Sequence, residues 1–229
     1  MSVILNIDTS VEKAYISIAK DGEILVQQIN EEQKEHGSFL QPAVHELLGS
    51  LSMQASQLDA ISVANGPGSY TGLRVSMASA KGLCFALNKP LITVRSLDVL
   101  AYAAIIDLAG EKWESPPIFF PMIDARRMEV FTAGYDALMN VVVEPVAMIL
   151  DEASFANSLL KNHGVFFGNG AEKWRSLCRH PHASFAEIKS NALAMSILAY
   201  KKYERKQFTE LAYSQPFYLK EFFDHSRPK

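Results

Sequence analysis

The chain has 229 residues, of which 48% are hydrophobic and 21% charged, a balance that is typical of globular proteins and excludes a disordered or fibrous one. Lysine and arginine total 22 against 25 aspartates and glutamates, so the formal net charge is −3 and bulk charge gives no sign of nucleic-acid binding. Cys84 and Cys178 form no CxxC pair and no stretch reaches the ~18–20 apolar residues of a membrane span, so we expect a reduced, cytoplasmic protein with neither a signal peptide nor a membrane segment.

Residues 1–110 predict an α/β layered sheet, because a hairpin and its neighbouring strand are followed by helices and strands in alternation. Asp21-Gly22 lies between two alternating runs and is a strong hairpin signal. Strands are expected at residues 2–9, 15–19, 24–26, 60–64 and 90–94, and helices at residues 38–51, 70–87 and 96–108.

Two consecutive prolines, Pro116 and Pro117, resist helix formation and predict a domain junction after residue 110. We therefore divide the chain into a first lobe, residues 1–110, and a smaller α/β lobe, residues 111–229. Near its start, Asp124 is expected to pair with an arginine across a turn. Strands are expected at residues 118–123, 130–135, 141–149 and 165–167, and helices at residues 152–160 and 190–202.

The most unusual local feature is a glycine-rich loop, residues 66–72, where a strand turns into a helix. Backbone amides and the helix dipole attract anions at such a place, so Gly66, Gly68 and Ser69 are candidates for a phosphate contact. The loop matches neither the Walker nor the dinucleotide pattern, and a tight turn that brings the helix close to the sheet is the favoured interpretation. Asp8, at the tip of the first strand beside Thr9, is a candidate to hold a hydrated magnesium ion or to act as a general base, although a lone aspartate at such a place is more often a turn or cap residue.

The helix at residues 38–51 has one apolar stripe, whereas the helix at residues 70–87 is apolar or small nearly all round, which is more than one buried face needs. The helix at residues 38–51 of the same chain can cover the helix at residues 70–87, or a partner subunit can, since a row of small residues permits close helix approach. Both hold if the helix pair packs against an equivalent pair of a partner, which gives a four-helix contact. We expect burial by a partner, and a symmetric homodimer through this surface when the chain is alone. The predicted interface residues are Phe39, Leu40, Ala43, Leu47, Leu73, Ser76, Met77, Ala80 and Cys84.

Four motifs, Ile7–Ser10, Gly66–Arg74, Ile123–Val130 and Pro216–Lys220, occur in the order seen in the TsaB (YeaZ) family of tRNA threonylcarbamoyladenosine biosynthesis proteins. The chain resembles this family over almost its whole length, although Tyr70 stands where many members carry phenylalanine. The resemblance implies an α/β, actin-like and sugar-kinase-like (ASKHA) fold of two ribonuclease-H-type lobes, the second of them reduced.

The resemblance also implies a non-catalytic scaffold, a paralogue of the TsaD transferase. Two histidines bind the metal in TsaD, and Ser96 and Leu100 correspond to them here; serine is a poor ligand and leucine is none. We therefore predict no catalytic residue, no metal and no cofactor. A vestigial anion or nucleotide contact, or a nucleotide between subunits, remains open; its candidates are Asp8, Thr9, Gly66, Gly68, Ser69, Gly168 and Gly170.

The partners that the resemblance implies are a TsaD-like transferase bound through the two helices, a TsaE-like ATPase, and tRNA indirectly. The modified base would be the adenosine next to the anticodon. The alternative is a stand-alone enzyme of the same fold, metallopeptidase-like or a phosphotransferase. For a phosphotransferase, Asp8 and the loop of residues 168–170 are the candidates; for a peptidase, the sequence offers no metal pair or activated nucleophile.

Overall fold

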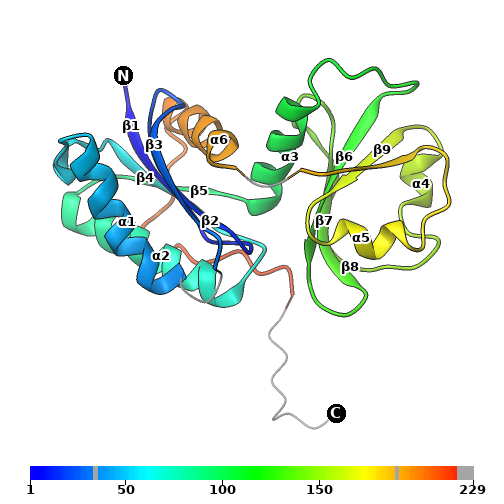
Figure 1. The fold of residues 1–229 in the computed structure, drawn as a ribbon, viewed down its shortest axis with the longest axis horizontal. Helices are drawn as coiled ribbons and strands as arrows, with labels where there is room; N and C mark the ends of the chain where they lie inside the picture. Colours follow the sequence, from blue (N-terminus) through cyan, green and yellow to red (C-terminus); the bar gives the residue numbers. More distant parts are fainter. Residues whose placement is uncertain (33–35, 189–190, 221–229) are drawn as a thin grey trace, which may run out of the picture.

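A computed structural model describes residues 1–32, 36–188 and 191–220 of the chain, and Figure 1 shows two sheets side by side. In the first sheet the strand order is β3-β2-β1-β4-β5. The hairpin strands β2 and β3 pair antiparallel, and β2 also pairs antiparallel with β1, whereas β4 and β5 continue the sheet in parallel. These strands are β1 (Val3–Asp8), β2 (Ala14–Lys20), β3 (Glu23–Asn30), β4 (Ala60–Ala64) and β5 (Leu91–Val94).

The second sheet repeats this arrangement. Its order is β10-β9-β6-β7-β8, with β6–β7 and β7–β8 antiparallel and β6–β9 and β9–β10 parallel. When the strands are numbered from β6 and the sheet is read from its β8 edge, the order is again 3-2-1-4-5. The predicted actin-like fold of two ribonuclease-H-type lobes is therefore confirmed. The strands are β6 (Pro117–Asp124), β7 (Glu129–Tyr135), β8 (Val141–Ile149), β9 (His163–Phe167) and β10 (Ala183–Ala186).

The helices differ strongly in length between the lobes. In the first lobe are α1 (His36–Ser50), α2 (Tyr70–Leu87), α3 (Ser96–Asp107) and a 3₁₀ turn, η2 (Ala55–Gln57); the second has α4 (Ala156–Leu159) and α5 (Ala171–Arg175), and α6 (Ala192–Glu204) follows. With helices of four and five residues, the second lobe is reduced, as predicted. The expected helix at residues 152–160 was too long, and α5 and β10 were not predicted. No helix among the described residues has the length and apolar content to cross a bilayer.

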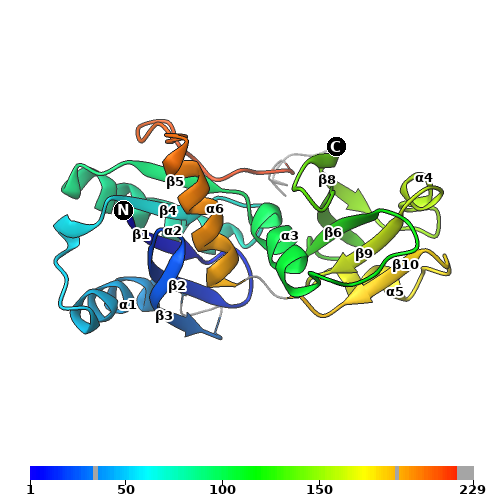
Figure 2. The same ribbon diagram turned by 90° about the horizontal axis from the view of Figure 1, so that it is seen from above.

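The helices pack on both faces of the first sheet and between the two sheets. Helices α1 and α2 cover one face of the first sheet and α6 covers the other, while α3 lies between the sheets (Figures 1 and 2). A single apolar core around α3 joins β4 and β5 of the first lobe to β6, β7 and β9 of the second. The two lobes are therefore packed together through α3 and not merely linked by the chain.

Helix α6 corrects the predicted division at residue 110. It belongs to residues 111–229 but packs on β1, β2, β3 and β5 of the first sheet. A buried polar network holds it there: Asn6 Nδ2 donates to Ser196 Oγ at 3.1 Å, and Ser62 Oγ donates to Asn6 Oδ1 at 2.6 Å. The bond from Asn6 to Ser196 joins α6 to β1, so the chain returns to the first lobe after β10.

Candidate functional site

The turn after β1 is closed by Asp8, whose side chain is 2% exposed. Its Oδ1 atom accepts hydrogen bonds from the backbone N and the Oγ of Ser10, at 2.9 and 2.6 Å. Thr9 Oγ1 donates to the carbonyl oxygen of Gly72 at 2.8 Å, and Ser69 N donates to that of Ser10 at 2.7 Å. These bonds fasten the turn to the first residues of α2, so Asp8 has the role of a turn residue.

The loop of residues 66–72 needs glycine because its backbone lies very close to the turn after β1. A Cβ on Gly68 would lie 2.1 Å from the carbonyl oxygen of Ser10, and one on Gly72 would lie 2.1 Å from that of Thr9. Ser69 caps α2, because its Oγ accepts from Gly72 N at 3.3 Å. The favoured interpretation, a tight turn that brings helix and sheet together, is confirmed; the phosphate contact stays a prediction.

Gly72→Ala is expected to lower the free energy of unfolding by about 1–3 kcal/mol, as overpacking does. The reason is the Thr9 carbonyl, which would have to move away from the new Cβ. In the same helix, Gly82 has nothing within 4 Å of its Cβ position, so Gly82→Ala is expected to raise stability by roughly 0.5–1 kcal/mol. Urea unfolding of both variants measures the difference; equal shifts would show that the contact with Thr9 does not matter.

A C-terminal strap, residues 209–220, brings the last motif onto the glycine loop. Phe217 N donates to the carbonyl oxygen of Asn65 at 2.7 Å, and the Arg95 guanidinium lies 5.2 Å from the centre of the Phe217 ring. At its end, Lys220 Nζ pairs with Glu129 Oε2 at 2.5 Å, on β7 of the second lobe. The four motifs that carry the family resemblance, far apart in sequence, therefore meet at one junction between the lobes (Figure 1).

The loop of residues 168–170 forms the other side of this junction. Asn169 Oδ1 accepts from Asp124 N at 2.8 Å, and its Nδ2 donates to Glu12 Oε1 in the first lobe, also at 2.8 Å. Gly168 and Gly170 have no room for a Cβ against β6 and β7. The Asp124 carboxylate forms its ion pair with Lys173 Nζ, at 2.6 Å, and accepts a hydrogen bond from Arg126 N, so it contacts an arginine across the turn through the backbone amide and not through the guanidinium. The loop therefore packs closely against the second lobe, and its Asn169 side chain connects it to Glu12 of the first lobe.

A cavity of about 550 Å³ lies between the lobes beside this loop. Four carboxylates and two basic groups are among the described residues that line it. Both basic groups are paired: Lys13 with Glu31, and Arg175 with Glu172 at 3.3 Å. A nucleotide polyphosphate would meet excess negative charge here, which disfavours phosphate binding. The geometry gives no support to a phosphotransferase.

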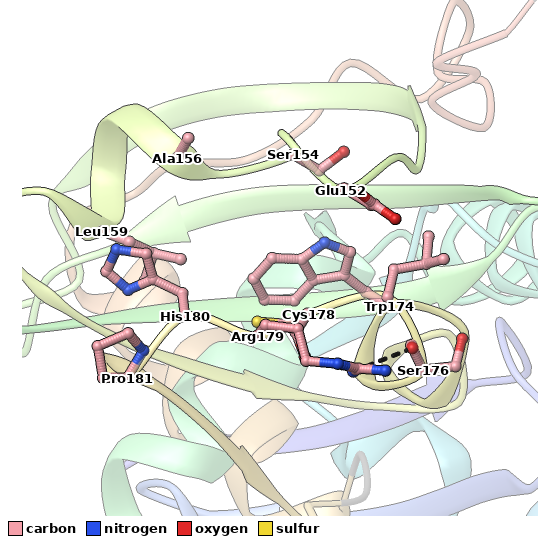
Figure 3. Close-up of a pocket in the computed structure, with 11 residues that line it drawn as sticks. Glu152, Ser154, Ala156, Leu159, Trp174, Ser176, Cys178, Arg179, His180 and Pro181 are labelled. Atoms are coloured by element: carbon pink, nitrogen blue, oxygen red, sulfur yellow. Dashed lines mark hydrogen bonds between the residues drawn. The ribbon is translucent and has the colours of Figure 1, made fainter.

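A second cavity, of about 420 Å³, lies in the second lobe (Figure 3). The indole of Trp174 forms its floor and is 1% exposed, and Arg179 Nη1 donates to the carbonyl oxygens of Ser176 and Cys178 at 3.2 and 2.8 Å. None of its lining residues belongs to the four motifs. We therefore leave this cavity outside the candidate site.

The predicted interface residues of α1 and α2 face the interior of the chain. Eight of the nine are at most 3% exposed, and Phe39 is partly buried in the same core. Burial raises the pKa of the Cys84 thiol to about 11, which fits a core side chain. The alternative, in which the two helices cover each other and the sheet, is confirmed, and the assignment to a partner is wrong for Leu40, Ala43, Leu47, Leu73, Ser76, Met77, Ala80 and Cys84.

The opposite side of α2 is the surface that the sequence analysis missed. Phe85 is 83% exposed, Ala78 is exposed, and the Cβ position of Gly82 meets open space. With Thr71 these residues form one helical stripe, which we call the outer face of α2. Because this helix is apolar or small nearly all round, its sequence could not tell the inner face from the outer one.

Comparison with known proteins identifies the family. The model of the family described as "TsaD: tRNA N6-adenosine threonylcarbamoyltransferase" matches residues 23–219. The chain belongs to this family. It is 35% identical over 152 residues to the tRNA threonylcarbamoyladenosine biosynthesis protein TsaB of Bacillus subtilis, and 33% identical over 129 residues to that of Haemophilus influenzae. These matches cover 65% and 56% of this chain, and the chain spans only 63% and 51% of the two relatives.

A solved structure is similar over nearly the full length. YeaZ from Pseudomonas aeruginosa is 25% identical, with a TM-score of 0.80 over 96% of this chain and 100% of that one. TsaB of Escherichia coli is 27% identical over 178 residues, which are 76% of this chain and 74% of the relative. The predicted likeness to TsaB (YeaZ) proteins is confirmed.

The resemblance places Ser96 and Leu100 at the positions of the two metal-binding histidines of the transferase, and the structure shows what these two residues offer. Ser96 is buried, and its backbone N donates to the carbonyl oxygen of Gly66 at 2.9 Å. Leu100 is 4% exposed and is one of the residues that line the cavity between the lobes. No three His, Cys, Asp or Glu side chains of the described part of the chain are grouped so that they could hold a metal. These residues do not fit the transferase metal, and no step is derived through one.

Proposed function

We propose that this chain is an accessory subunit of tRNA threonylcarbamoyladenosine biosynthesis that supports a TsaD-like transferase and has no catalytic activity of its own. Membership of the family and the names of the TsaB relatives support the pathway. The observation that carries the non-catalytic role is the pair Ser96 and Leu100, which offers one buried hydroxyl and one hydrocarbon side chain at the metal-binding positions.

The outer face of α2 is our proposed contact for the transferase. Phe85 offers a large apolar side chain, and Ala78 and Gly82 leave room for a helix to approach closely. When the chain is alone, the same face would pair with a second copy, which is the proposed homodimer. A TsaE-like ATPase as a further partner rests on the resemblance alone.

Reconstitution with purified components tests the proposal. The transferase and the other pathway proteins are incubated with a tRNA transcript, with and without this chain, and the modified adenosine is measured by mass spectrometry. We expect the product to fall at least ten-fold when the chain is omitted. Equal yields would overturn the proposed function, and ATP hydrolysis or tRNA modification by the chain alone would favour the enzyme alternative.

A further inference from the structure

The turn between β6 and β7 presents two adjacent arginines in an unusual backbone conformation. Arg126 and Arg127 both have left-handed φ angles, of +69° and +49°. The turn is nevertheless well fixed: Asp124 Oδ1 accepts from Arg126 N at 2.5 Å, and Ala125 N and Glu129 N close it with backbone bonds of 3.1 Å each. Left-handed non-glycine residues are costly and concentrate at functional sites, so this exposed turn calls for an explanation.

The charges of the two arginines are not neutralised by their neighbours. The carboxylate of Asp124 pairs with Lys173, and that of Glu129 with Lys220, so both acids of the turn already have cationic partners. Within residues 1–32, 36–188 and 191–220, no side-chain hydrogen bond or ion pair engages either guanidinium. Two positive charges thus project from a fixed turn of a chain whose net charge is −3.

Two exposed aromatic rings belong to the strap and the start of α2, which an ion pair connects to this turn. Residues Tyr70 and Tyr218 are 39% and 47% exposed, and the centres of their rings lie 5.7 Å apart. The guanidinium of Arg74 lies 5.1 Å from the centre of the Tyr70 ring. Tyr218 is two residues, at most ~7 Å of backbone, from Lys220, whose ion pair with Glu129 joins the strap to the arginine turn. We call Arg74, Tyr70, Tyr218, Lys220, Arg126 and Arg127 the basic–aromatic surface.

We propose that the basic–aromatic surface binds RNA directly, with Arg126 and Arg127 on backbone phosphates and the tyrosine rings against unpaired bases. Guanidinium groups bind phosphate oxygens in a fork, and aromatic rings stack on unpaired bases in single-stranded recognition. An acidic protein segment would use the arginines but leave the two exposed rings without a role. The identity of the RNA as tRNA rests on the proposed function.

Binding of a fluorescently labelled tRNA transcript to the full-length chain, followed by anisotropy over a salt series, tests this proposal. The double variant Arg126→Gln/Arg127→Gln is expected to bind at least ten-fold more weakly, with the slope of log K against log salt reduced by about 1.4–1.8 for two lost phosphate contacts. The matched control, Arg205→Gln/Lys206→Gln, removes the same charge from exposed positions just after α6 and is expected to bind within two-fold of the wild type. Circular dichroism checks that both variants fold.

A third variant tests the aromatic part. Tyr218→Ala is expected to weaken binding of a labelled, unstructured 12-nucleotide RNA about five-fold or more. The proposal is overturned if the wild type binds neither RNA, if the arginine variant binds as its control does, or if polyglutamate displaces the RNA while Tyr218→Ala has no effect. If tRNA modification in the reconstituted reaction requires this chain but the variants bind RNA as the wild type does, RNA binding by this surface is rejected and the proposed function still stands.

Discussion

Ala80→Glu is expected to lower the free energy of unfolding by about 3 kcal/mol or more, because it places a carboxylate in a dry core without a partner. Ala80 is 0% exposed and belongs to the core that α1 and α2 form with the first sheet. The midpoint of urea unfolding, followed by circular dichroism, measures the loss.

The matched control is Ala78→Glu, two residues earlier in α2, where the side chain is exposed. A surface substitution of this kind is expected to change stability by no more than about 0.5 kcal/mol. If the two variants lost stability equally, the assignment of inner and outer faces to α2 would be wrong. The pair therefore separates the core of the chain from the surface that we propose for the partner.

Phe85→Glu is expected to weaken association with the TsaD-like transferase at least 30-fold, since an aromatic side chain at the centre of an interface commonly contributes ~2 kcal/mol or more. Phe85 is 83% exposed, so the free chain should keep its stability. Isothermal titration calorimetry of the purified transferase with the chain measures the change.

Leu138→Glu provides the control for this experiment. Leu138 is 82% exposed on the turn between β7 and β8, so the substitution puts the same charge in place of an equally exposed apolar side chain in the other lobe. We expect its affinity for the transferase to match the wild type. Loss of affinity in both variants, or in neither, would reject the outer face of α2 as the contact.

The fold was predictable because its elements are strongly marked in the sequence. Alternating strands and the Asp21-Gly22 hairpin agree with the structure, and the order of elements in the first lobe predicts its layered sheet. The short elements α5 and β10 were missed because four or five residues carry too little periodicity. Helix α6 was assigned to the wrong lobe because its contacts, such as the bond from Ser196 to Asn6, 190 residues away, have no local signal in the sequence.

The candidate site was harder to predict than the fold. The motifs identified the right segments, but a pattern of glycines does not distinguish a phosphate contact from a close backbone approach such as that of Gly72 to Thr9. The connections between the lobes, from Lys220 to Glu129 and from Asn169 to Glu12, join residues more than 90 positions apart and have no local signal. Which face of α2 is buried depends on the same kind of tertiary contact.

The central claim is that this chain contributes a binding surface, whereas the transferase supplies the reacting groups. Titration of the chain into a reconstituted modification reaction, at a fixed and limiting concentration of the transferase, tests it most directly. We predict that the initial rate of modified adenosine formation rises with added chain and levels off at about one chain per transferase. A full rate at a small fraction of that amount would mean that the chain turns over as an enzyme and would contradict the account.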